Sequence, residues 1–377
     1  FWGMGFHFST TYYTTKKRLQ QSLSFLAGSS KNAYNKSEEK GNKCTRLGGK
    51  NLLQTEELLQ LLRASEQFLS GEELSRKLGV TRTAIWKKIE QLRTEGYEIE
   101  SITRKGYRLR KAPDILTETE IRAHLTPGTF GASLTALQTV DSTNNEARRL
   151  AEKGAPHGSV VVSEEQTGGK GRLGRQWVSP PGSGIWFSVL LRPQALPEEI
   201  TGLTLLSAVA VCRAIRKKTG LDAKIKWPND VVIGTKKVCG ILTELSAEWE
   251  RVHYLIVGIG VNVNQSAFPP ELSERATSLS LETDRPVVER AVLLCTILEE
   301  FERLYKQYGV SSFPEEYRAN CITVGRAVSL TRAGKTIKGF ASGVRDDGAL
   351  LIQTENEGTI AATSGEVVVQ GIYGQTI

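Results

Sequence analysis

Apolar residues recur at helical spacing between residues 52 and 95 and predict three short helices. Leucines from Leu52 to Leu62 mark the first helix. Residues 70–78 form the second, and Thr81 caps a third with its apolar face at Ile85, Ile89 and Leu92. Alternating segments at 97–102 and 106–109, on either side of a basic turn, predict two strands. Three helices followed by a β-ribbon is the order of a winged helix-turn-helix.

The middle of the chain mixes strands and helices, after a linker at 110–116 that contains Pro113. The strands are joined largely by turns and hairpins, which favours an α+β domain with a mixed sheet over repeated βαβ units. Strands are expected at 134–140, 159–164, 184–191, 225–227, 240–245 and 254–264, and helices at 117–124, 144–153, 200–220, 286–309 and 312–320.

The last segment, from about residue 323, contains short strands separated by glycine turns. Its strands are expected at 328–330, 336–340, 349–352, 359–360 and 367–369, which predicts a small SH3-like β-barrel. The predicted fold class is therefore multidomain α+β. Its domains are a winged helix-turn-helix at 51–112, a central α+β domain at 113–322 and the barrel at 323–377.

Positive charge is concentrated in the N-terminal part of the chain. The net charge is +8, and residues 1–50 carry nine Lys/Arg against two Glu, while residues 51–112 carry twelve against nine. A nucleic-acid site is therefore expected near the N-terminus. Residues 1–50 have no hydrophobic period, so we interpret them as a disordered basic tail or an extended reading frame rather than a transit peptide.

Other compositional features exclude several classes of protein. No stretch approaches the roughly 18 apolar residues of a spanning helix, so no membrane partner is expected. Five cysteines without a C-x-x-C pair indicate free thiols in a reducing compartment, which predicts a cytoplasmic location. The four histidines are scattered, so no protein metal site is predicted.

A glycine-rich basic loop is the first candidate for chemistry. Residues 163–177 read SEEQTGGKGRLGRQW and contain Lys170, Arg172 and Arg175. The G-x-G-x-x-G spacing at 169–174 is not a dinucleotide fingerprint, because no helix is expected to follow, and no Walker A sequence is present. Such a loop brings backbone N–H groups and cations to an anion, although a basic surface hairpin is the simpler alternative.

Four further motifs have plain structural explanations when each is taken alone. Turn chemistry accounts for Lys226-Trp-Pro-Asn-Asp230, and helix capping for Asp141-Ser-Thr-Asn144. Lys236-Lys-Val-Cys-Gly240 follows a short hairpin, which returns Lys237 to the same region. Paired glycines in Gly258-Ile-Gly-Val-Asn262 suggest close approach of the backbone to a ligand.

Together, in this order and spacing, the motifs resemble the biotin protein ligase family. The resemblance covers about residues 52–377, and the three-part layout resembles the bifunctional subclass that also represses the biotin operon. It implies that biotin and ATP form biotinyl-5′-AMP and that biotin then passes to a lysine of a biotin carboxyl carrier protein, in acetyl-CoA carboxylase or another biotin-dependent carboxylase. A lipoate-type ligase and a ligand-sensing regulator without catalysis are the alternatives. Leu173 stands where some members have arginine.

The resemblance also implies roles for particular residues. Lys237 and Arg172 are the expected catalytic residues, and Mg²⁺ is expected with ATP, with Asp230 as a residue that would help to hold it. Operator DNA and, with adenylate bound, a second copy of the chain are the other expected partners. Biotin is assigned to Ser142, Thr143, Asn144, Gln166, Gly169, Lys170, Gly171, Arg172, Lys237, Gly240, Gly258 and Gly260, with Gly258 and Gly260 leaving room for its rings. ATP is assigned to Arg172, Arg175, Trp177, Asn229, Asp230 and Asn262, and DNA to Thr81, Arg82, Thr83, Trp86, Lys87, Arg104 and Lys105.

Overall fold

The computed structural model describes residues 55–126, 128, 130–248, 251–283, 289–332 and 334–377. All of them belong to one unit, Leu53–Ile377. The tail predicted at 1–50 lies outside the described residues. The domain boundaries that we predicted after residues 112 and 322 stay predictions. Among the described helices, none combines the length and apolar character needed to cross a bilayer.

The first part of this unit is the expected winged helix-turn-helix. A helix at 55–63 is followed by α2 (Gly71–Leu78), α3 (Arg82–Thr94) and the antiparallel strands β1 (Glu98–Ile102) and β2 (Gly106–Lys111). The hydroxyls of Ser70 and Thr81 accept the N–H groups of Glu73 and Ala84, as the capping pattern predicted. The predicted apolar positions form a core of their own, which contains Leu58, Leu59, Leu62, Leu74, Ile85, Ile89, Leu92 and Tyr97.

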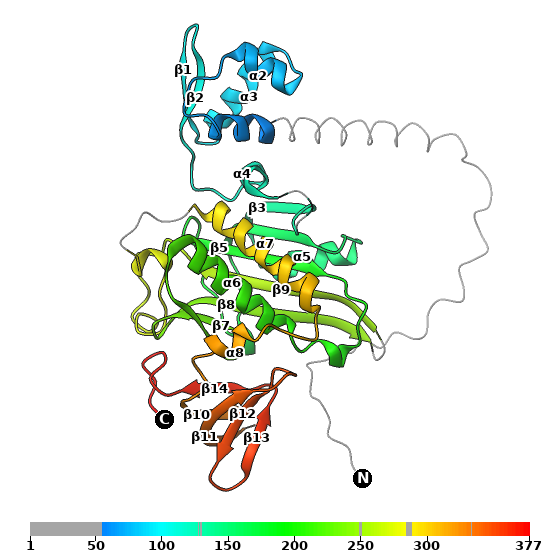
Figure 1. Ribbon diagram of the computed structural model, residues 1–377, viewed down its shortest axis with the longest axis vertical. Helices are drawn as coiled ribbons and strands as arrows, with labels where there is room; N and C mark the ends of the chain where they lie inside the picture. The colour runs from blue at the N-terminus through cyan, green and yellow to red at the C-terminus, as the bar shows by residue number, and fades with distance from the viewer. Residues whose placement is uncertain (1–54, 127, 129, 249–250, 284–288, 333) are drawn as a thin grey trace, which may run out of the picture. The chain divides into compact units, whose positions relative to one another are not determined.

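The central part is built on one seven-stranded mixed sheet (Figure 1). Its strand order is β3-β4-β5-β9-β8-β7-β6, in which β3 and β4 are parallel and all other neighbours antiparallel. The mixed sheet is thus confirmed. The strands are β3 (Leu134–Val140), β4 (Ser159–Gln166), β5 (Gly184–Leu191), β6 (Ala223–Lys226), β7 (Asp230–Ile233), β8 (Lys236–Glu248) and β9 (Arg251–Asn262).

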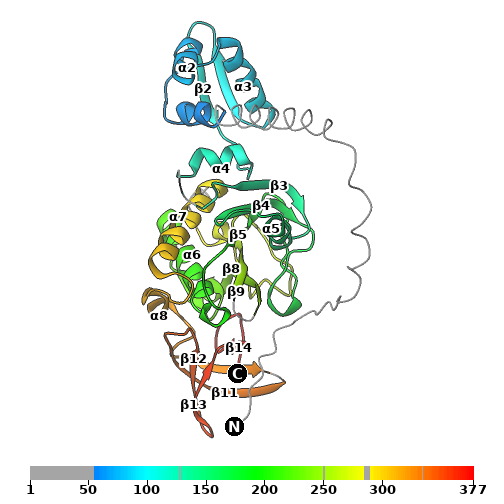
Figure 2. The ribbon, with the colours of Figure 1, turned by 90° about the vertical axis from the view of Figure 1, so that its right-hand side faces the viewer.

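Helices cover both faces of this sheet (Figure 2). In β4, Val160 and Val162 join the core beneath α6 and α7, whereas Val161 joins the core beneath α5. Burial on both faces explains why the central strands contain continuous apolar runs, such as 160–162 in β4 and 189–191 in β5. The helices are α4 (Glu118–His124), α5 (Thr143–Glu152), α6 (Leu203–Thr219), α7 (Arg290–Tyr308) and α8 (Glu316–Asn320), with short 3₁₀ turns at Arg172–Gly174, Pro197–Glu199 and Leu279–Leu281.

The last part is a five-stranded antiparallel sheet, where the sequence predicted a small SH3-like β-barrel. Its β-sheet character is confirmed, and closure into a barrel stays a prediction. Its strand order is β13-β12-β11-β10-β14. Its buried residues, such as Val328, Leu350 and Ile352, belong to the same apolar cluster as the central sheet. The strands are β10 (Ala327–Arg332), β11 (Lys335–Val344), β12 (Leu350–Thr354), β13 (Gly358–Ala362) and β14 (Glu366–Val369).

A buried arginine joins the linker to the central sheet. Arg290, at the start of α7, is 1% exposed, and its guanidinium lies 2.9 Å from Glu164 of β4 and 3.1 Å from Asp114 of the linker. Glu164 also accepts the backbone N–H groups of Leu116 and Gly182. A buried carboxylate with this many partners is costly to leave without its cation.

We expect Arg290→Met to destabilise the protein by about 3–5 kcal/mol, because it leaves Glu164 buried without its counter-charge. Urea unfolding measures the change. Arg303→Met is the matched control, since Arg303 pairs with Glu300 on the same helix but is 55% exposed, and we expect it to cost at most about 1 kcal/mol. Equal losses for the two variants would contradict the importance of the buried pair.

Candidate active site

The predicted motifs converge on one cavity of about 680 Å³. It is bordered by the start of α5, the glycine loop, the turn before β7, strands β8 and β9, and the C-terminal segment. Of the residues that we assigned to biotin or ATP, Gly169 alone does not line it. A Cβ atom at Gly169 would lie 2.3 Å from the carbonyl oxygen of Trp177, so this glycine permits a close backbone contact within the loop.

A carboxylate surrounded by cations occupies one end of the cavity. The Lys237 ammonium lies 2.6 Å from Asp230 Oδ1, and the Tyr373 hydroxyl donates to Asp230 Oδ2 at 2.9 Å. Burial alone would raise the pKa of Asp230, but the charges of Lys237 and Lys226 and these hydrogen bonds hold it below its ordinary value. Asp230 is therefore ionised and fixes the position of the Lys237 ammonium.

Two more cations lie near Asp230, of which Lys226 is buried and Arg172 is half-buried. Lys226 is 7% exposed and donates to the Val367 carbonyl at 3.0 Å, while Arg172 donates to Asn229 Oδ1 at 2.9 Å. Burial lowers the pKa of both side chains. In the described part of the chain, the cavity lining has only two carboxylates, Asp230 and Glu366, against Lys170, Arg172, Arg175, Lys226, Lys237 and Arg275. This end is suited to bind anions.

Neutral hydrogen-bonding groups form a second part of the cavity lining. Gln166 Oε1 accepts the Thr143 N–H at 2.8 Å, and its amide group donates to Ser179 at 2.9 Å. Asn144 accepts from the Ser188 hydroxyl at 2.6 Å and donates to Glu244 at 2.8 Å. These bonds hold the amides in one orientation before any ligand arrives.

Ser142 shows why capping does not explain the motif at 141–144. Ser142 precedes the first residue of α5, but its hydroxyl makes no capping hydrogen bond. Its side chain is 2% exposed and lines the cavity. A buried hydroxyl that does not cap its helix remains available to a ligand.

The paired glycines of β9 accommodate side chains of the protein itself. A Cβ atom at Gly258 would lie 2.2 Å from Asn144 Oδ1, and one at Gly260 would lie 2.6 Å from Trp177 Nε1. We expected both glycines to leave room for the rings of a ligand. The structure instead places Asn144 and Trp177 directly above them, so the glycines act on the ligand site through these two side chains.

The glycine loop is bonded to the rest of the protein at both ends. Lys170 donates to Asn145 at 2.7 Å, and Arg175 forms an ion pair with Glu366 of β14. Leu173, at the tip, is 71% exposed and has a left-handed backbone conformation, with φ of 59°. Arg175 must leave Glu366 before it contacts a phosphate, so its assignment to ATP stays a prediction.

Several residues of the site were absent from our assignment. Lys226 was part of a motif but received no role, and Ser188 was the one polar residue in the apolar strand at 184–191, which was a usable signal. Glu244 closes the motif KVCGILTE at 237–244 and likewise received no role, whereas Tyr373 carried no such signal. Tyr373 lines the cavity and contacts Asp230 across 143 residues of sequence, whereas Glu244 only accepts a hydrogen bond from Asn144.

The seven residues assigned to DNA all lie on exposed parts of the winged helix-turn-helix. Thr81, Arg82, Thr83, Trp86 and Lys87 are exposed at the start of α3, and Arg104 and Lys105 are exposed in the turn between β1 and β2. Trp86 is 52% exposed, which is unusual for so large an apolar side chain. Arg82 forms an ion pair with Glu72 at 2.5 Å. This surface is consistent with the assignment, which stays a prediction.

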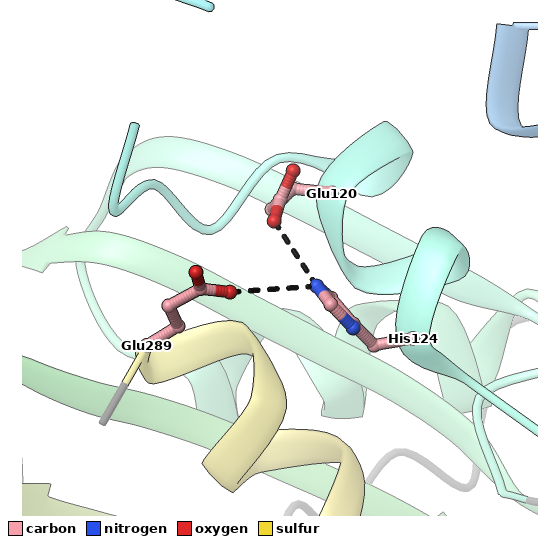
Figure 3. Close-up of side chains that lie close together, drawn as sticks. All are labelled: Glu120, His124 and Glu289. Atoms are coloured by element: carbon pink, nitrogen blue, oxygen red, sulfur yellow. Dashed lines mark hydrogen bonds and ion pairs between the residues drawn. The ribbon is translucent and has the colours of Figure 1, made fainter. Parts of the chain in front are cut away.

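Glu120, His124 and Glu289 form a separate cluster outside the cavity lining (Figure 3). His124 Nε2 lies 3.2 Å from Glu120 and 3.7 Å from Glu289, and it points between the two carboxylates. Arg63 forms ion pairs with both glutamates, and the Tyr97 hydroxyl donates to Glu120. Because Arg63 already supplies the positive charge, we interpret the group as an ion-pair cluster rather than a metal site.

Comparison with known proteins gives three matches to family models. Residues 136–262 match the Biotin/lipoate A/B protein ligase family, residues 54–108 an HTH domain, and residues 323–369 the Biotin protein ligase C terminal domain. The chain is 42% identical over 321 residues to the bifunctional ligase/repressor BirA of Bacillus subtilis, covering 82% of this chain and 97% of that protein. It is 29% identical to BirA of Escherichia coli, covering 79% and 92%.

A solved structure resembles the catalytic part. The biotin protein ligase from Aquifex aeolicus in complex with biotin and ATP is 35% identical, with a TM-score of 0.54. The match covers 63% of this chain and 99% of that one.

We expect Gly258→Ala to weaken binding of biotin, the ligand that the sequence resemblance implies, by about 10- to 100-fold. The added methyl group would overlap Asn144 Oδ1 and displace the whole amide. Isothermal titration with biotin measures the loss. Gly343→Ala is the control, because a Cβ atom there, in β11, meets only Leu351 at 3.9 Å. Unchanged biotin affinity in Gly258→Ala would remove Asn144 from the ligand site.

Proposed function

The chain belongs to the biotin protein ligase family, in the branch of bifunctional ligases and repressors, and we propose that the cavity described above carries both of its half-reactions. Such a protein activates biotin with ATP to biotinyl-5′-AMP, transfers biotin to a carrier lysine and represses biotin genes by binding DNA. One observation carries the proposal. A network of hydrogen-bonded neutral side chains and a cluster of cations around Asp230 line the same cavity.

Two groups of side chains in the cavity recognise different parts of the substrates. The ureido ring of biotin is neutral and needs hydrogen-bond partners, which Ser142, Thr143, Asn144 and Gln166 supply. The biotin carboxylate and the α-phosphate are anions, and Lys237 and Arg172 neutralise them. Trp177, Asn229 and Asn262 line the part of the cavity that we assign to the nucleotide.

Neither half-reaction needs a nucleophile from the protein. The biotin carboxylate attacks the α-phosphorus, pyrophosphate leaves, and the carrier amine later attacks the carbonyl of the mixed anhydride and releases AMP. The enzyme must hold two anions together and neutralise the charge that develops on the phosphate oxygens. Lys237 suits this task because Asp230 keeps its ammonium in place.

Mg²⁺ does not fit a protein-held position in this cavity. Asp230 is already bonded to Lys237 and Tyr373, and Glu366, the other carboxylate of the described lining, is paired with Arg175. We therefore withdraw Asp230 as a metal ligand. Mg²⁺ would enter with ATP, held by phosphate oxygens and water.

The partners follow from the same assignment. The carrier is a biotin carboxyl carrier protein, with acetyl-CoA carboxylase the first candidate, and the DNA is an operator read by the start of α3. A two-fold operator implies a homodimer, formed with adenylate bound. The four described cysteines are free and buried, which supports a reducing, cytoplasmic location.

The lipoate-type and non-catalytic alternatives are less well supported. The relatives that match over most of their length are named as biotin ligases or ligase/repressors. A lipoyl group also lacks a ureido ring, so it would offer no polar partner to the buried Ser142 hydroxyl, which does not cap its helix. The convergence of Lys237, Arg172 and Asp230 argues for retained catalysis.

We expect Lys237→Met to lower biotin-dependent ATP–pyrophosphate exchange by about 10²- to 10³-fold, because one charge-stabilising donor is lost. Lys236→Met is the matched control, since the neighbouring Lys236 does not line the cavity, and its exchange rate should equal that of the wild type. Circular dichroism checks that both variants fold. Exchange near the wild-type rate in Lys237→Met would refute the proposed mechanism.

Lys87→Ala should weaken operator binding and lower the slope of log K against log salt by about one unit, through the loss of one phosphate contact. The probe is a duplex selected by the wild-type protein from random sequences in the presence of biotin and ATP. Lys306→Ala, on α7, is the control and should leave the slope unchanged. An unchanged slope in Lys87→Ala would remove that residue from the DNA surface. Pyrophosphate exchange at the wild-type rate shows that the ligase part of the variant is intact.

A further inference from the structure

We propose that Tyr373, in the segment that follows β14, is a positioning residue for adenylate formation and acts through Asp230 on Lys237. The inference rests on the function proposed above, and it assigns to that reaction a residue outside all the motifs. The juxtaposition that carries it is a chain of two contacts. The Tyr373 hydroxyl donates to one oxygen of Asp230 at 2.9 Å, and the other oxygen lies 2.6 Å from the Lys237 ammonium.

The need for such a residue follows from the charges around Asp230. The charges of two ammonium groups, Lys237 and Lys226, both lower the pKa of this one carboxylate. Without a further constraint, the carboxylate is free to turn towards Lys226. The Tyr373 hydroxyl holds Oδ2, and this leaves Oδ1 directed at Lys237. The aromatic ring also lies 5.2 Å from the Lys226 ammonium and gives that charge a second partner.

The backbone around Tyr373 is held in an uncommon conformation. Its φ is 59°, in the left-handed region that aromatic residues rarely adopt. Ile372, just before it, is completely buried, and the Tyr373 N–H donates to the Thr235 carbonyl at 3.0 Å. Thr235 lies in the turn that leads into β8, two residues before Lys237. The segment therefore contacts both the carboxylate partner of Lys237 and the turn that carries Lys237.

The phenol is suited to act as a lasting hydrogen-bond donor. Burial, together with the neighbouring Asp230 carboxylate, holds the pKa of Tyr373 well above its ordinary value. The side chain therefore keeps its proton over the whole range in which the enzyme would work. It lines the cavity but is placed to orient Asp230 rather than to react.

Tyr373→Phe tests the proposal, because it keeps the ring and removes only the hydroxyl. We expect the kcat of biotin-dependent ATP–pyrophosphate exchange to fall about 10-fold, which is the effect of losing one hydrogen bond to a charged group. The dissociation constant for biotin should stay within about two-fold of the wild type. Tyr254→Phe, which changes a tyrosine of β9 outside the cavity lining, is the control and should leave both values unchanged.

The pH profile separates positioning from a structural effect. The hydrogen bond from Tyr373 lowers the pKa of Asp230, so its removal raises that pKa. Since Asp230 must be ionised, the variant should lose exchange activity at a higher pH than the wild type as the pH falls. The proposal would be overturned if Tyr373→Phe kept the wild-type exchange rate and lost activity at the same low pH as the wild type. A loss of biotin affinity without a loss of rate would also overturn it.

A double variant tests whether Tyr373 acts through Lys237. In Lys237→Met the second contact is already gone, so adding Tyr373→Phe should cause no further fall in exchange. Losses that multiply would overturn the proposed route. This result is distinct from failure of the proposed function itself, which would show as near wild-type exchange in Lys237→Met alone.

Discussion

One buried carboxylate holds the catalytic end of the cavity together. Arg172, Lys226 and Lys237 come from three separate segments, and like charges gathered in a buried site repel one another unless an anion lies among them. Asp230 supplies that anion, and Tyr373 brings the C-terminal segment to it. The remaining positive charge is left for substrates. In the function proposed above, the same arrangement stabilises the empty site and selects its ligands, because a carboxylate and a phosphate would complete the neutralisation that Asp230 begins.

The sequence predicted most of the architecture because local patterns determine it. The strands at 134–140 and 184–191 have the predicted bounds, and the caps at Ser70 and Thr81 form as expected. β7 was not predicted, because its four residues lie between two turns and carry almost no periodic signal. For the site, the motifs identified the lining residues of α5, the glycine loop, the turn before β7, β8 and β9, but not those between 265 and 276 or between 365 and 375. They could not reveal Tyr373, whose importance depends on a contact between distant parts of the chain.

The motif at 258–262 correctly marked part of the cavity, but the physical reason that we inferred for its two glycines was incomplete. Glycine at 258 and 260 was expected to give a ligand direct access to the strand. In the structure, Asn144 and Trp177 occupy the space above these positions. The glycines therefore shape the ligand site through the side chains that they admit. Only the packing of α5 and the glycine loop on β9 reveals which side chains cover these glycines. The spacing of residues along one strand does not specify it.

The winged helix-turn-helix has a core of its own and lies before every element of the catalytic cavity along the chain. Synthesis proceeds at about 5–20 residues per second, so roughly tens of seconds separate the emergence of α3 from that of Tyr373. A domain of this size folds within that time. We therefore expect each newly made chain to pass through a stage in which the winged helix-turn-helix is complete and the cavity does not yet exist. During translation, the winged helix-turn-helix is therefore made before the cavity to which we assign biotin.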